Sequence, residues 1–132
     1  MDEVKTILKA NRIGTLATLN GDGSPWATPV HVFADGGYAY WFSKDTHQHS
    51  LNITLDPRVS LALWSNAEGT KGAYLSGLAE KLDGKGTEKA LDIVVKEIGI
   101  VPNVFENTSA YRLKIGQSDS SKTSENRWYF YS

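Results

Sequence analysis

Cysteine is absent from this 132-residue sequence. Its absence excludes a disulfide framework, a thiolate metal site and a cysteine nucleophile, and it is consistent with a reducing compartment. A chain of this length can nevertheless bury a substantial core without disulfides or a structural metal. The sequence shows neither an internal repeat nor a domain linker, so we expect residues 1–132 to form a single domain.

An excess of either charge is also lacking, because 14 basic side chains balance 15 acidic ones and leave a net charge of -1. Without a basic excess, neither a nucleic acid nor an anionic membrane is an expected partner. No apolar run approaches the ~20 residues of a membrane-spanning helix. The first residues lack the basic stretch and apolar run of a signal peptide. We therefore expect a cytoplasmic protein.

Short stretches of alternating apolar and polar residues predict β-strands. The alternation is clearest at Val59, Leu61 and Leu63. The expected strands cover residues 15–19, 26–33, 38–43, 59–64, 73–82, 110–115 and 127–131. Glycine-rich turns at residues 20–23 and 35–37 join the first three strands, which implies an antiparallel sheet. Closing this sheet would remove its free edges, so we predict a mainly β fold, a six- to seven-stranded antiparallel β-barrel.

Three short helices are expected to plug or flank this barrel. Their expected N-terminal caps are Asp2, then Asp45 or Thr46, and then Thr87. Their expected C-terminal ends are Gly14, Pro57 and Gly99. The third helix is expected to bury one apolar stripe, formed by Leu91, Val94, Val95 and Ile98.

The second expected strand contains two prolines, Pro25 and Pro29. Proline has no backbone N–H to donate to a neighbouring strand, so Pro29 predicts an edge or an interrupted position. The unpaired backbone groups of an edge strand offer a place where a ligand can bind.

The segment from Ser43 to Asn52 is the most informative for function, because it follows a strand and opens a helix. The first N–H groups of a helix lack internal partners and carry partial positive charge, which together favour an anion. Four donor residues, Thr46, His47, Gln48 and His49, are expected in this first turn. A phosphate would suit the position. The alternative is a capped surface helix with two solvated histidines.

A metal site is not predicted here, because His47 and His49 are two residues apart in an expected helix and would not face one way. No third ligand has a matching spacing. His31 is expected on the barrel wall. The sequence also lacks a Ser-His-Asp order, a glycine-rich phosphate loop and a paired-carboxylate motif, so no catalytic residue is predicted.

Five segments occur in an order that is typical of a known family. They are residues 14–18 (GTLAT), 21–30 (GDGSPWATPV), 40–43 (YWFS), 52–59 (NITLDPRV) and 75–80 (LSGLAE). Together they resemble the pyridoxamine-5′-phosphate-oxidase-like flavin proteins of the split-barrel fold. The resemblance covers about residues 5–82 well, and beyond them it extends only to the order of the elements. It implies a split β-barrel that binds FMN, or a deazaflavin, between two copies of the chain.

The resemblance also implies which residues hold the cofactor. The strand beside the flavin ring would supply Trp26, Ala27, Thr28, Pro29 and Val30. The ribityl chain and phosphate would contact Phe42, Ser43, His47, Gln48 and His49. At positions 47–49 the family usually carries a hydroxyl residue, then an arginine or other polar residue, then a lysine. This sequence has no arginine or lysine there, but two histidines, with Lys44 as the nearest base. The charge of a histidine depends on pH, so two alternatives stay open: this chain binds FMN more weakly than the family usually does, or it binds a different cofactor.

The function that the resemblance implies is that of an FMN-dependent oxidoreductase acting on a small molecule, with the cofactor at a homodimer interface. Two alternatives stay open. One is a non-catalytic protein that binds a flavin or deazaflavin, for example in a stress response. The other is a split barrel that has lost its cofactor site.

Overall fold

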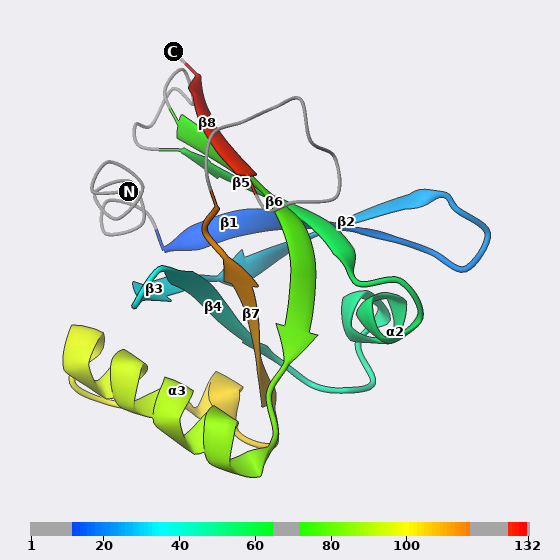
Figure 1. Cartoon of the computed structure of the whole chain (residues 1–132). Helices are drawn as coiled ribbons and strands as arrows, with labels where there is room; N and C mark the ends of the chain where they lie inside the picture. The colour runs from blue at the N-terminus through cyan, green and yellow to red at the C-terminus, as the bar shows by residue number, and fades with distance from the viewer. Residues whose placement is uncertain (1–11, 65–71, 117–126, 132) are drawn as a thin grey trace.

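The computed structural model describes residues 12–64, 72–116 and 127–131. Within them lie eight strands, two helices and one short 3-10 helix (Figure 1). The strands are β1 (Ile13–Leu19), β2 (Pro25–His31), β3 (Phe33–Asp35), β4 (Tyr38–Ser43), β5 (Arg58–Trp64), β6 (Gly72–Lys81), β7 (Ser109–Lys114) and β8 (Arg127–Tyr131). The helices are α2 (Gln48–Leu55), α3 (Gly84–Ile98) and the 3-10 helix η1 (Asn103–Phe105). The expected first helix and the loop at residues 117–126 lie outside the described residues.

All the strands belong to one curled antiparallel sheet, with the order β2-β1-β5-β6-β7-β4-β3 and with β8 paired to β6. The predicted antiparallel split-barrel class is therefore confirmed. The described residues hold one strand more than the seven expected, because residues 26–33 do not form a continuous strand. The sheet bends at Val32, whose N–H donates to the carbonyl of Arg12, and the chain continues as β3.

The prolines predicted the position of β2 correctly, because this strand lies at one end of the sheet order and pairs with β1. Pro25, Trp26, Ala27, Pro29 and His31 are exposed along it. Gly14 does not end a helix, as the sequence suggested, but lies inside β1 opposite Val30. A side chain at this position would meet β5, since an added Cβ would lie 2.7 Å from the Leu63 Cδ2.

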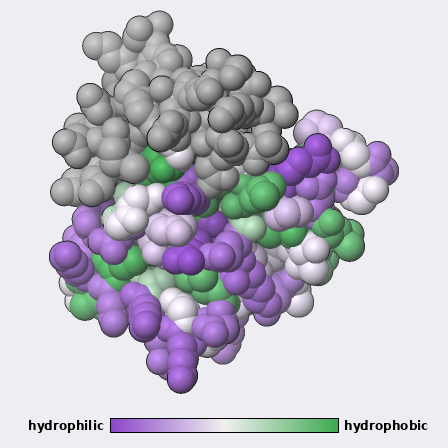
Figure 2. Space-filling view, in the orientation of Figure 1, coloured by the Kyte–Doolittle hydropathy of each residue, from purple (hydrophilic) through white to green (hydrophobic). Residues whose placement is uncertain are grey.

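The core has two parts. One part fills the inside of the curled sheet, where Val59, Leu61 and Leu63 are buried, as their alternation predicted. The rings of Trp41 and Tyr111 stack in the same part, with their centroids 6.1 Å apart. The other lies between the sheet and α3. Its buried members are Phe33, Tyr40, Phe42, Ala90, Val94, Phe105 and Ala110. Figure 2 shows hydrophilic side chains over much of the opposite, outward side of α3.

Helix α3 begins at a different cap from the one expected. The Asp83 carboxylate accepts the Gly86 N–H at 2.7 Å, whereas the Thr87 hydroxyl accepts the Ala110 N–H of β7 at 3.0 Å. The end at Gly99 is confirmed, with a left-handed φ of 82°.

The expected apolar stripe of α3 is wrong for two residues, Val95 and Ile98, which are 45% and 39% exposed. The helix packs on β7 and β3 and turns a different side to the sheet, so that Ala90 and Val94 are its buried residues. None of the helices in the described part of the chain is long and apolar enough to cross a membrane.

Helix α2 ends at Leu55, with Asp56 as its C-cap next to the expected Pro57, but neither expected cap is used at its start. His47 occupies the N-cap position. Asp45 instead accepts the Tyr111 hydroxyl at 3.3 Å and pairs with the Lys81 ammonium at 3.0 Å. The turn before α2 is thus tied to β6 and β7.

The polarity of α2 is unusual for a surface helix. Its buried residues are His49, Ser50, Asn52 and a single apolar one, Ile53, whereas Leu51 and Leu55 are 48% and 76% exposed. Apolar surface accordingly appears beside α2 in Figure 2. Both the burial of Ile53 in the core and hydrogen bonds of buried polar side chains therefore attach this helix to the sheet.

We predict that Gly14→Ala destabilises the fold by about 1–3 kcal/mol, because the added methyl group forces Leu63 or the backbone of β5 to move. Gly21→Ala is the matched control, since nothing lies within 4 Å of a Cβ at that turn position. Urea unfolding of both variants checks the prediction. Equal midpoints for the two variants would show that β1 and β5 do not approach this closely.

Candidate functional site

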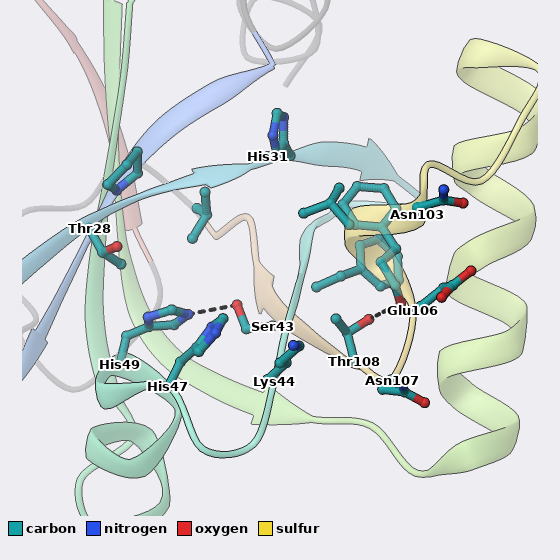
Figure 3. A pocket seen from close by; sticks show the side chains of 15 residues that line it. Thr28, His31, Ser43, Lys44, His47, His49, Asn103, Glu106, Asn107 and Thr108 are labelled. Atoms are coloured by element: carbon teal, nitrogen blue, oxygen red, sulfur yellow. Dashed lines mark hydrogen bonds between the residues drawn. The ribbon is translucent and has the colours of Figure 1, made fainter.

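A cavity of about 590 Å³ opens beside the edge strand of the sheet. Its walls are residues 28–31 of β2, the end of β4 with Lys44, the start of α2, and residues 103–108 before β7. Figure 3 shows the side chains of Ser43, Lys44, His47 and His49 gathered on one side, opposite the segment that holds Asn103 and Thr108. Three stretches of the chain that are distant in sequence, residues 28–31, 42–49 and 103–108, therefore meet around one space.

Seven of the ten cofactor-binding residues expected from the sequence line this cavity: Thr28, Pro29, Val30, Phe42, Ser43, His47 and His49. Trp26, Ala27 and Gln48 do not. Trp26 and Ala27 lie nearer the β1–β2 hairpin, and the Gln48 amide donates to Asn52 Oδ1 at 2.8 Å. The structure brings these residues together, while their role in binding stays a prediction.

Residues 103–108 form a wall that sequence reasoning missed, and they contain η1. No motif marks them as part of a site. Only the pairing of two strands indicates that residues 103–108 lie near the site, because β7 lies beside β4 with Ser43 opposite Ser109. This register places the residues just before β7 at the end of β4, next to the turn that leads into α2.

The side chains of β2 alternate between the two faces of the strand. Figure 3 shows Thr28 on the side that faces His47 and His49, and His31 on the other side. The His31 ring makes an edge contact with Phe105, with centroids 6.1 Å apart. The cavity therefore reaches around the exposed edge of β2 rather than lying wholly beneath it.

His49 is the most buried titratable group on the cavity, with 7% of its surface exposed. Its Nε2 lies 2.6 Å from Ser43 Oγ, a hydrogen bond in which either atom can donate. Burial lowers the pKa of His49, and the nearby charge of His47, whose ring centroid is 5.4 Å away, lowers it further. His49 is therefore neutral near pH 7, and one of its nitrogens orients the Ser43 hydroxyl.

The start of α2 provides the electrostatic character of the site. No side chain from the described residues caps the helix, so its first N–H groups are available to another acceptor. Lys44 and His47 line the cavity beside this helix end, and both can carry positive charge. Asp45, the carboxylate nearest in sequence, is directed instead to Lys81 and Tyr111. This donor set suits an anionic group such as a phosphate.

Other chemistries have less support in the described parts of the chain. They contain no cluster of three or more His, Cys, Asp or Glu side chains that could hold a metal ion. Glu106 supplies the single carboxylate among the described residues that line the cavity, so the site lacks a carboxylate pair for acid and base catalysis.

A family profile described as pyridoxamine 5′-phosphate oxidase matches residues 1–120 of this chain. The chain belongs to the pyridoxamine 5′-phosphate oxidase family. The resemblance noted from the five sequence segments is thereby confirmed. No curated protein sequence matches this family member.

Several proteins of known structure share the fold of this chain. A heme-binding protein of Mycobacterium smegmatis has a TM-score of 0.71 and 27% identity, over 84% of this chain and 49% of that protein. This chain therefore spans about half the length of that relative. A conserved hypothetical protein of Mycobacterium tuberculosis has a TM-score of 0.74 and 21% identity, over 97% and 82% of the two chains. An F420 reductase has a TM-score of 0.67 and 18% identity, over 83% and 90%.

We predict that His49 makes folding stability depend on pH. The pKa of His49 in the folded protein is below 6.5, the ordinary histidine value that applies in the unfolded chain. At a pH between the folded and the unfolded pKa, the unfolded chain therefore binds more protons than the folded protein. The contribution of neutral His49 to the free energy of unfolding is fully present above about pH 6.5, and it is lost as the pH falls toward the pKa of His49 in the folded protein.

His49→Gln tests this prediction, because glutamine keeps a polar contact with Ser43 but does not titrate. Urea unfolding between pH 7.5 and 5 should show the wild type losing more stability than the variant. Parallel pH profiles for the two proteins would contradict a buried neutral His49.

Proposed function

We propose that this chain binds FMN, or a deazaflavin with a similar phosphate-bearing tail, in the cavity beside α2. The phosphate binds at the start of α2, and the ring lies along β2. The protein then acts as an oxidoreductase on a small molecule. Its membership of the pyridoxamine 5′-phosphate oxidase family and the likeness to an F420 reductase fold support this proposal.

The observation that carries the proposal is the uncapped start of α2 together with the side chains around it. Ser43 offers a hydroxyl held by His49, and Lys44 and His47 add positive charge beside the helix end. A phosphate at this point accepts backbone N–H bonds that no described side chain takes. Lys44 and His47 thus supply the basic groups near the helix start, since residues 47–49 contain no arginine or lysine.

The ring site follows from the edge position of β2. Thr28 and Val30 face the cavity, and the outer edge of β2 has no neighbouring strand among the described residues. The ring can lie against this backbone, and a second copy of the chain can cover it from the other side. Twofold homodimers are the commonest oligomers, and such a dimer would bury the exposed β2 side chains, including Trp26.

A bound flavin supplies the hydride or electron transfer, so the protein needs to supply position and a dry cleft. In this chain, β2 orients the ring, and the Ser43–Lys44 turn and α2 anchor the tail. Phe42 and Phe105 provide an apolar boundary, with centroids 4.9 Å apart. No side chain is assigned as a catalytic acid or base.

Heme is a second candidate ligand, and one observation favours it. All three histidines of the sequence, His31, His47 and His49, line this one cavity. Imidazole is a common axial ligand of heme iron. The relative from Mycobacterium smegmatis is a heme-binding protein, and its identity to this chain is 27%.

We predict that His47→Ala combined with His49→Ala weakens FMN binding at least tenfold, while riboflavin binding changes much less. The reason is that riboflavin lacks the phosphate that this turn is proposed to hold. Fluorescence titration of each flavin measures both constants. His31→Ala is the matched control, because His31 lines the cavity on the other face of β2, away from the proposed phosphate turn, and its loss should change FMN and riboflavin binding to the same extent.

Two outcomes would contradict the phosphate site. One is an equal loss of FMN and riboflavin in the double variant, and the other is a wild type that binds neither flavin. Titration with hemin then tests the second candidate. A Soret shift that disappears in one of the single histidine variants would favour heme.

A further inference from the structure

The side chain of Asn52 lies at the centre of a buried hydrogen-bond network that joins α2 to the β1–β2 hairpin. Its Nδ2 donates to Thr18 Oγ1 at 3.0 Å and to Asn20 Oδ1 at 2.9 Å. Its Oδ1 accepts from Gln48 Nε2 at 2.8 Å. Asn52 is 1% exposed and Thr18 is 3% exposed, so the bond between them is shielded from water, whereas Asn20 is half-buried and Gln48 is exposed. An amide can make about four hydrogen bonds, and this one makes three.

The network connects the two walls of the cavity without lining it. Gln48 belongs to the first turn of α2, between His47 and His49. Asn20 opens the hairpin that leads into β2, where its N–H donates to the carbonyl of Ser24. Asn52 is the residue that bonds to both sides. Asn52 therefore ties the proposed phosphate turn to the hairpin that leads into the β2 wall.

Stability alone does not explain a buried amide at this position. Burying an amide costs free energy that hydrogen bonds only partly return, and an apolar side chain of similar size is usually at least as stabilising. The same helix buries Ile53 in the core but leaves Leu51 and Leu55 exposed, so apolar burial accounts for only part of its attachment. Directional bonds, in contrast, hold a helix in one position and orientation.

We propose that Asn52 is a positioning residue, which fixes the first turn of α2 against the β1–β2 hairpin and so sets the geometry of the anion site. Gln48 and Thr18 are its two supports. Gln48 therefore acts through Asn52 and not by direct contact with a ligand. This inference rests on the proposed function for the choice of FMN as the probe.

Two substitutions test the network without enlarging the core. Thr18→Val keeps the shape of the side chain and removes the oxygen that accepts from Asn52. Gln48→Met keeps the length and removes the donor to Asn52. Each should weaken FMN binding by roughly fivefold, the effect of one lost hydrogen bond, and should change riboflavin binding by less than twofold.

Matched controls separate positioning from a general effect on the fold. Thr18→Ser keeps the hydroxyl and should keep the wild-type preference for FMN over riboflavin. Thr54→Val removes a hydroxyl from the same helix that bonds only within it, to the carbonyl of Ser50, and should also keep that preference. Thermal unfolding of each variant shows which of them are folded under the assay conditions.

A readout on the unliganded protein makes the test independent of flavin. The imidazole ¹⁵N shifts of His49 report its hydrogen bond to Ser43, which depends on the position of the first turn of α2. These shifts should move in Thr18→Val and in Gln48→Met and stay unchanged in the two controls. The inference is overturned if the shifts do not move, or if the variants keep the wild-type flavin preference. If the wild type binds neither flavin, the proposed function fails, while the imidazole shifts still decide the role of Asn52.

Discussion

The hydrogen bonds that hold α2 against the sheet determine the geometry of the candidate site. His49 bonds to Ser43 at the end of β4, and Asn52 bonds to Thr18 in β1. Because these contacts are buried and directional, they fix the helix start more strictly than apolar packing would. The cost is an unusual helix that exposes Leu51 and Leu55. The position of the proposed anion site and its distance from β2 both follow from this arrangement.

Much of the fold could be predicted because its strands carry local patterns. Residues 38–43 form β4 as expected, and Pro29 marks the edge strand. The errors arose where long-range contacts select between local possibilities. Thr87 and Asp83 are both suitable caps, but the Thr87 hydroxyl is taken by the Ala110 N–H of β7. The break at Val32 follows from the curl of the sheet and has no signature in the sequence.

The site was predictable only in part, for a related reason. Ser43, His47 and His49 occur within one short segment, so a strand followed by a helix was enough to place them together. Residues 103–108 reach them only through the pairing of β7 with β4. Gln48 was expected to hold a ligand because it is a donor in the first turn. Its role in binding stays a prediction, and its spacing of four residues from Asn52 was the signal for the hydrogen bond that the structure shows.

The proposed flavin site depends on where a phosphate binds. A crystal structure of the protein grown with FMN tests this most directly. We expect the phosphate to lie within hydrogen-bond distance of the first N–H groups of α2 and of Ser43 or His47, and the ring to lie along β2. A phosphate directed into solvent, or a flavin bound away from α2 and β2, would contradict it.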